Sequence, residues 1–187
     1  MKRFLGVLII IMLLCCGCGI EEKKDKSKKE ETKKTEEIVE LNDKVNTATY
    51  DQFMSITVGE KYDKVVKILG EANRLKESDD GKTYFWDIEG NRSISIKFNN
   101  KNEVILKSQG DFEDNTKGIT IEAYNQLNEG MKREDVEKII GVGNLSLEEK
   151  DGDVIKSLYS YNNEDGSSAI ITYHNDVLYS KSKNRLD

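Results

Sequence analysis

The strongest constraint on this chain is a pattern that occurs twice in its sequence. Residues 49–70 can be set above residues 120–141 without a gap, at a constant offset of 71 positions. The matching pairs are Phe53 and Tyr124, Ile56 and Leu127, Gly59 and Gly130, Lys61 and Lys132, Val65 and Val136, Ile68 and Ile139, and Gly70 and Gly141. Self-similarity at a fixed spacing is the signature of repeated structural units. The sequence therefore predicts two related units, at residues 48–116 and 117–187.

Each unit begins with a pattern typical of two short helices. Thr49 and Thr120 are good N-cap residues for a first helix, and Gly59 and Gly130 are expected to end it. A second helix with one apolar face follows at residues 61–69 and 132–140, and Gly70 and Gly141 are expected to stop it.

Strands are expected after the helices. Apolar and polar residues alternate over residues 84–88 and 94–98, which predicts two strands with one buried face. A third strand is predicted at residues 104–106, and the second unit repeats the three at residues 159–161, 169–173 and 177–179. Because a unit of about 70 residues is marginally stable alone, we expect both units to pack into one α+β body with a shared antiparallel sheet.

The N-terminus has the order of an export signal. A positive start is followed by an apolar run at residues 4–14 and then by cysteines, and this resembles the bacterial lipoprotein signal over residues 1–18. Gly17 before Cys18 favours Cys18 as the lipidated residue, with Cys16 as the second candidate and an uncleaved membrane helix as the alternative. The resemblance implies a lipid anchor on the extracytoplasmic face of the cell membrane.

Residues 19–47 are predicted to be a flexible tether, because lysines and acids are interleaved over residues 21–40 and the apolar residues there are only Ile38 and Val39. The whole chain carries a net charge of -6, which does not favour a nucleic-acid partner. All cysteines lie in the leader and the single histidine is His174, so neither a metal site nor a cofactor site is predicted. No catalytic motif is present, and we do not expect an enzyme.

The two units resemble a known family. Both units carry the pattern aromatic-x-x-Ile/Leu-x-x-Gly, followed by Val-x-x-Ile-Leu/Ile-Gly and an aromatic strand. This pattern is similar to the repeat of the β-lactamase inhibitor protein (BLIP) family and of its Gram-positive lipoprotein relatives. The small lipoprotein of the outer-membrane assembly machinery has a similar single unit. The resemblance covers residues 48–187 and implies helix-loop-helix units with four-stranded sheets. It also implies a concave sheet that grips a protein target, with two hairpin loops entering the target's active site.

The corresponding loops here are residues 88–91 and 162–167. Glu89 stands where the inhibitors have an aspartate, and the second loop has no aromatic residue. The resemblance thus implies a protein-binding surface for an unidentified envelope or secreted protein, while the alternative is a structural or assembly subunit of an envelope complex. The candidate contact residues, from the outward positions of the strands and from the two turns, are Phe85, Asp87, Glu89, Lys97, Ser160, Glu164, Ile170 and Thr172.

Overall fold

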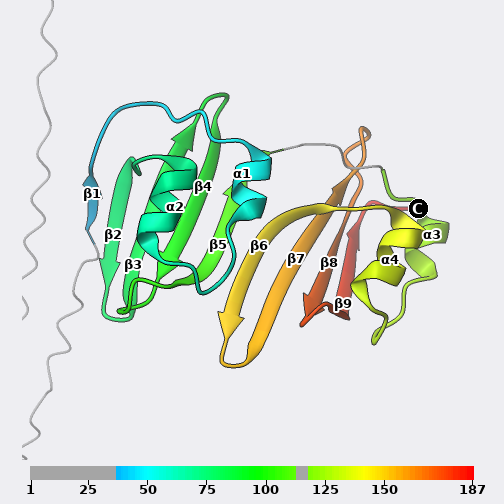
Figure 1. Ribbon diagram of the computed structural model, residues 1–187. Coiled ribbons are helices and arrows are strands. Elements are labelled where there is room, and N and C mark those ends of the chain that lie inside the picture. Colours follow the sequence, from blue (N-terminus) through cyan, green and yellow to red (C-terminus); the bar gives the residue numbers. More distant parts are fainter. Residues whose placement is uncertain (1–36, 113–117) are drawn as a thin grey trace, which may run out of the picture. The chain divides into compact units, whose positions relative to one another are not determined.

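The computed structural model describes residues 37–112 and 118–187, which fall within one compact unit spanning residues 35–187 (Figure 1). The predicted leader, its cysteines and most of the predicted tether lie outside the described residues. Within the described part, no helix has both the length and the apolar character needed to cross a membrane. The elements are β1 (Ile38–Glu40), α1 (Tyr50–Ser55), α2 (Tyr62–Leu69), β2 (Arg74–Ser78), β3 (Gly81–Ile88), β4 (Arg92–Phe98), β5 (Val104–Gly110), α3 (Ile121–Asn125), α4 (Arg133–Ile140), β6 (Asn144–Asp151), β7 (Val154–Asn162), β8 (Ser168–His174) and β9 (Val177–Asn184).

The strands form one antiparallel sheet in sequence order from β1 to β9, so the expected α+β body with a shared antiparallel sheet is confirmed. Two helices precede strands β2 to β5, and two more precede strands β6 to β9 (Figure 1). We call these two groups the first half and the second half. The halves meet where β5 pairs with β6 over three residue pairs, from Leu106 with Glu149 to Ser108 with Leu147.

Strands β1, β2 and β6 were not predicted from residue alternation. The sequences of β2 and β6 are rich in charged and polar residues, and most of their side chains are only half-buried. Their place in the sheet comes from backbone pairing with β3 and β7, which a hydrophobic pattern does not reveal. The four strands in each half agree with the number that the family resemblance implied.

The first helix of each half is shorter than predicted. Thr49 caps α1 by accepting a hydrogen bond from the Gln52 amide, but the helix ends at Ser55, before the expected stop at Gly59. Gly59 adopts a positive φ of 91° in the following loop and donates its amide hydrogen to the carbonyl oxygen of Val104 at 2.8 Å. The chain leaves the helix early because this loop pairs with the start of β5. The second helices end at Gly70 and Gly141, as predicted.

The core lies between the helices and one face of the sheet. One face of β3 and β4 is buried, as the alternation predicts, and its fully buried side chains are Trp86, Ile94, Ile96 and Phe98. The indole nitrogen of Trp86 donates a hydrogen bond to the carbonyl oxygen of Gly70 at 2.9 Å, which ties the end of α2 to β3. Burial of side chains of this size stabilises a fold by roughly 2 kcal/mol each.

A lysine closes the end of the first helix in each half. Lys107 on β5 has a side chain only 2% exposed, and its ammonium group donates to the carbonyl oxygen of Ile56 at 2.6 Å. Lys181 on β9 donates in the same way to the carbonyl oxygens of Tyr124 and Leu127, at 2.7 Å each. The last carbonyls of a helix lack partners within the helix, so these cations satisfy them. Neither lysine was singled out from the sequence.

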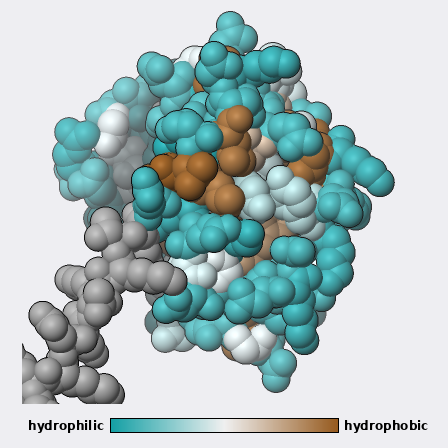
Figure 2. Space-filling view, turned by 90° about the vertical axis from the view of Figure 1, so that its left-hand side faces the viewer, coloured by the Kyte–Doolittle hydropathy of each residue, from teal (hydrophilic) through white to brown (hydrophobic). Residues whose placement is uncertain are grey.

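The segment from Ile38 to Asn46 corrects the predicted tether. Strand β1 extends the sheet beside β2, and Asn46 donates through its side chain to the carbonyl oxygen of Leu69 at 2.6 Å. The last ten or so residues of the predicted tether are therefore part of the folded body, because asparagine side chains supply hydrogen bonds that the apolar content does not. Figure 2 looks from this side and shows hydrophobic residues gathered within a largely hydrophilic surface. The exposed large apolar residues of this segment are Ile38, Val39, Leu41 and Val45.

Candidate protein-interaction surface

The face of the sheet turned away from the helices is the candidate site, and we call it the open face. Directly paired residues of antiparallel strands point to the same side, so the register defines which residues this face carries. One row crosses the sheet from β2 to β9 and is named the central row. Its residues are Arg74, Phe85, Ser95, Ser108, Leu147, Leu158, Thr172 and Ser180.

Arg74 holds two predicted contact residues in place. Its guanidinium group lies over the ring of Phe85, 5.2 Å from the ring centroid, and donates from Nε to the carboxylate of Asp87 at 3.2 Å. A second donor of the same group reaches the other carboxylate oxygen of Asp87, and this pairing raises the pKa of Arg74. A paired and stacked guanidinium restricts both neighbours. Phe85 and Asp87 thus form a preorganised pair at the surface, which the sequence did not reveal because Arg74 lies on an unpredicted strand.

Lys97, another predicted contact residue, lies on the open face but is already partnered. Its ammonium group donates to the carboxylate of Asp80 at 2.6 Å, across from the turn between β2 and β3. This hydrogen bond lowers the pKa of Asp80 to about 2. A partner that approached Lys97 would therefore meet a neutralised pair rather than a free cation.

The second half contributes an apolar centre to the open face. Leu147 and Leu158 are direct neighbours in the central row, and both are half-buried. Ile170, a predicted contact residue, is 44% exposed and pairs with Ser160. Thr172 follows Leu158 in the central row, so three of the predicted residues surround this apolar pair. Leu147 was missed because a register shift between Leu145 and Leu147 places these two leucines on opposite faces of the sheet, which alternation does not predict.

The two predicted contact turns lie at one end of the sheet. Glu89 is in the turn between β3 and β4, and Glu164 is in the turn between β7 and β8, and both are exposed. In an antiparallel sheet, β3 and β7 run in the same direction because they are four strands apart, so the turns that follow them share an end. The eight predicted residues are thus divided between the open face and the turns at its end.

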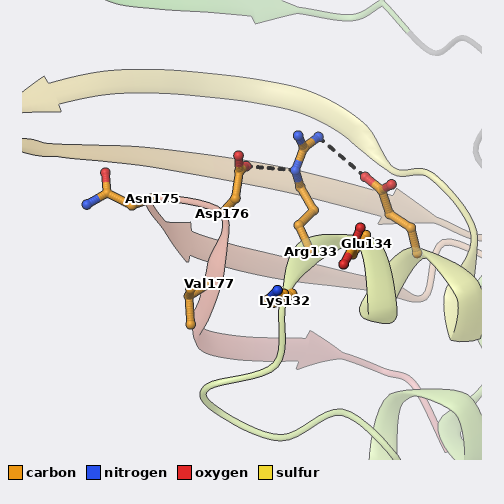
Figure 3. A pocket seen from close by; sticks show the side chains of 7 residues that line it. Lys132, Arg133, Glu134, Asn175, Asp176 and Val177 are labelled. Atoms are coloured by element: carbon orange, nitrogen blue, oxygen red, sulfur yellow. Dashed lines mark hydrogen bonds and ion pairs between the residues drawn. The ribbon is translucent and has the colours of Figure 1, made fainter.

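A cleft lies on the other side of the sheet. It has a volume of about 410 Å³ and lies beside the N-terminus of α4 and the turn between β8 and β9 (Figure 3). Arg133 points into it and donates to Asp176 at 2.8 Å, to Glu137 at 3.4 Å and to the hydroxyl of Tyr159 at 2.9 Å. Because these groups bond to one another, the arrangement fastens α4 to the turn.

Among residues 37–112 and 118–187, His174 and the acidic side chains are the residues that could contribute ligands to a metal ion. No group of three or more histidine, cysteine, aspartate or glutamate residues is placed there to hold a metal ion. His174 ends β8 on the open face, where its ring stacks on that of Tyr179 with the centroids 3.9 Å apart. This stacking gives the histidine a packing role at the surface.

Comparisons with known proteins concern the fold and the family of this chain. A family model described as β-lactamase inhibitor (BLIP) matches residues 49–161. The structure is similar to that of a candidate β-lactamase inhibitor protein from Streptococcus mutans, with a TM-score of 0.59, 16% sequence identity, and coverage of 76% of this chain and 92% of that chain. An extracellular protein with an SCP domain from Bacillus anthracis is far less similar, with a TM-score of 0.31, 13% identity, and coverage of 81% of this chain and 49% of that chain. No functionally curated protein matches the chain.

Proposed function

We propose that this chain, which belongs to the β-lactamase inhibitor (BLIP) family, is a protein-binding module that uses the open face of its sheet. The observation that carries the proposal is the Phe85–Asp87 pair held by Arg74, on the same face of the sheet as the apolar centre at Leu147 and Leu158. Protein interfaces combine an apolar centre with a polar rim, and side chains held in place before binding lose less entropy on association.

The setting of this module is also a proposal. We infer that the two halves are tandem copies, because residues 49–70 and 120–141 match without a gap and Lys107 and Lys181 close their first helices alike. We further infer that Cys18 carries a lipid that anchors the chain outside the cytoplasm. Nineteen residues separate Cys18 from Ile38, so the folded body would lie at most about 65 Å from the lipid.

The partner class follows from the family. The Streptococcus mutans protein of similar fold is described as a candidate β-lactamase inhibitor, and inhibition of an extracytoplasmic enzyme is the form of protein binding that we test first. Glu89 and Glu164 lie at one end of the sheet and would reach furthest towards a bound enzyme.

The test uses the full chain and a double variant, Phe85→Ala with Asp87→Ala, as baits on envelope and secreted fractions of the source cell. A partner retained by the full chain is then purified, and its affinity is measured for both proteins. Loss of an aromatic anchor and its paired acid is expected to weaken binding by about 30-fold or more.

A matched control carries Val142→Ala with Glu134→Ala, which removes an exposed apolar residue and an exposed acid outside the open face. This control should bind as the full chain does. Equal binding by all three proteins would reject the open face as the site, and an assembly role in an envelope complex would then be the better description.

A further inference from the structure

Strand β9 is the last strand of the sheet, and no other strand of the described residues lies along its outer edge. Its first residues are covered, because Leu178 exchanges hydrogen bonds with the loop at Gly130 and Met131. Among the described residues, the backbone from Ser180 to Asn184 bonds only to β8. Exposed strand edges carry free donors and acceptors that can pair with another strand.

The corresponding edge of β5 in the first half is occupied. Val104 exchanges hydrogen bonds with the loop at Gly59 and Glu60, as Leu178 does with its own loop. Beyond that point, Leu106 to Ser108 pair with strand β6. Residues Ser180 to Ser182 of β9 thus correspond to Leu106 to Ser108 of β5, which pair with β6. No described strand pairs with the corresponding edge of β9.

Charge indicates what kind of strand fits. In the first half, β6 brings Glu148 opposite Lys107, and the carboxylate lies 3.8 Å from the ammonium group. Lys181 occupies the matching place in the second half, 4.3 Å from the centroid of the Tyr124 ring, and its ammonium group contacts no carboxylate among the described residues. An incoming strand with an acid at its central position would complete this arrangement.

We propose that the outer edge of β9 binds an extended acidic segment of a partner protein, which adds as a further antiparallel strand and places a carboxylate opposite Lys181. Addition of a strand to a sheet edge is an established way of recognising peptides, with affinity from the main chain and specificity from alternate side chains. Symmetrical pairing of two copies through β9, centred on Lys181, is disfavoured because it would place the two lysines directly opposite each other.

This site is separate from the open face, and the experiment can tell them apart. A labelled synthetic peptide with the sequence of residues 144–151, which contains the β6 acids, is titrated against the full chain by fluorescence anisotropy. We expect saturable binding, and at least about fivefold weaker binding when the peptide carries Lys in place of Glu148. The double variant Phe85→Ala with Asp87→Ala should bind the peptide as the full chain does.

Hydrogen exchange locates the bound peptide, and protection confined to residues 180–184 is expected. Protection at residues 104–108 would instead mean that the peptide had replaced β6, and it would overturn the proposal. Lys181→Met should abolish the difference between the two peptides, whereas Lys183→Met should preserve it. If Lys181→Met fails to fold, the two peptides are still compared on the unaltered chain. Equal binding of the Glu148 peptide and its Lys-containing version would refute the proposal that Lys181 selects an acidic segment.

Discussion

Replacement of Lys107 by methionine is the sharpest test of how the halves are held together. The change keeps an unbranched apolar side chain of similar length and removes only the ammonium group. That group donates to the carbonyl oxygen of Ile56 at 2.6 Å, lies 4.9 Å from the centroid of the Phe53 ring, and faces Glu148 at 3.8 Å. Its loss therefore affects the end of α1 and the junction between β5 and β6 together.

The expected cost can be estimated from these contacts. A hydrogen bond to a charged group contributes about 1.5–3 kcal/mol, and removal of one partner of a buried ion pair costs about 3–5 kcal/mol. The Glu148 side chain is 22% exposed, so water can solvate part of its charge after Lys107 is lost. The lower end of the range for a buried ion pair therefore applies. We expect Lys107→Met to lower the free energy of unfolding by about 3 kcal/mol.

Urea denaturation followed by circular dichroism measures this cost, with Lys181→Met as the matched control. Lys181 donates to the carbonyl oxygens of Tyr124 and Leu127 and leaves no buried carboxylate behind. Because Lys181 is only half-buried, water can reach both carbonyls after its loss, and its replacement should cost about 1.5 kcal/mol. In thermal unfolding, Lys107→Met should lower Tm by about 6–12 °C.

The pH dependence gives a second readout. Burial lowers the pKa of Lys107 below its usual value of 10.5, so the unfolded chain holds the proton more tightly than the folded protein. Holding Lys107 charged in the folded protein therefore costs stability, and this cost is complete below the folded-state pKa of Lys107. The cost disappears as the pH rises to the pKa of a free lysine. The stability of the native protein relative to Lys107→Met should increase over that interval. A cost below about 1 kcal/mol, or equal costs for both lysine variants, would refute the reasoning.

Two further predictions concern the core. Gly81→Ala should destabilise the fold by about 3 kcal/mol or more, because the new Cβ would overlap the backbone oxygen of Phe98. Gly152 has a φ of +61° with open space around it, so Gly152→Ala should cost about 1 kcal/mol. Chemical denaturation of both variants measures these costs. Burial raises the pKa of Tyr159 to about 12, so the neutral phenol stabilises the fold fully below pH 10, and this contribution is lost as the pH rises towards 12. Absorbance titration should show the Tyr159 phenol ionising together with unfolding. Ionisation of Tyr159 near pH 10 in the folded protein would contradict its burial.

Much of the helical structure was predictable because its signals are local. Thr49 and Gly70 mark helix boundaries through hydrogen bonds and backbone angles that depend on a few neighbouring residues. Alternation likewise identified β3 and β4, since each has one buried face. The end of α1 was misplaced because contact with Val104, more than forty residues away, ends the helix before Gly59.

The candidate site was only partly predictable for the same reason. Phe85 and Asp87 could be placed on the outward face by counting along one strand, but the partner that fixes them, Arg74, is known only from the pairing of β2 with β3. The apolar pair of Leu147 and Leu158 depends in the same way on the register of β6 with β7. Cross-strand neighbours are set by pairing over distance, which a single strand's pattern does not contain.

By itself, the sequence determined the matched segments, most helix boundaries and the alternating strands, because caps, glycines and periodicity act over a few residues. The tertiary structure alone decided that Ile38–Glu40 extends the sheet, that Lys107 is buried opposite Glu148, and that β9 is the last strand of the described sheet. These features arise from contacts between residues distant in the chain, where backbone pairing and burial outweigh the local preference of each segment.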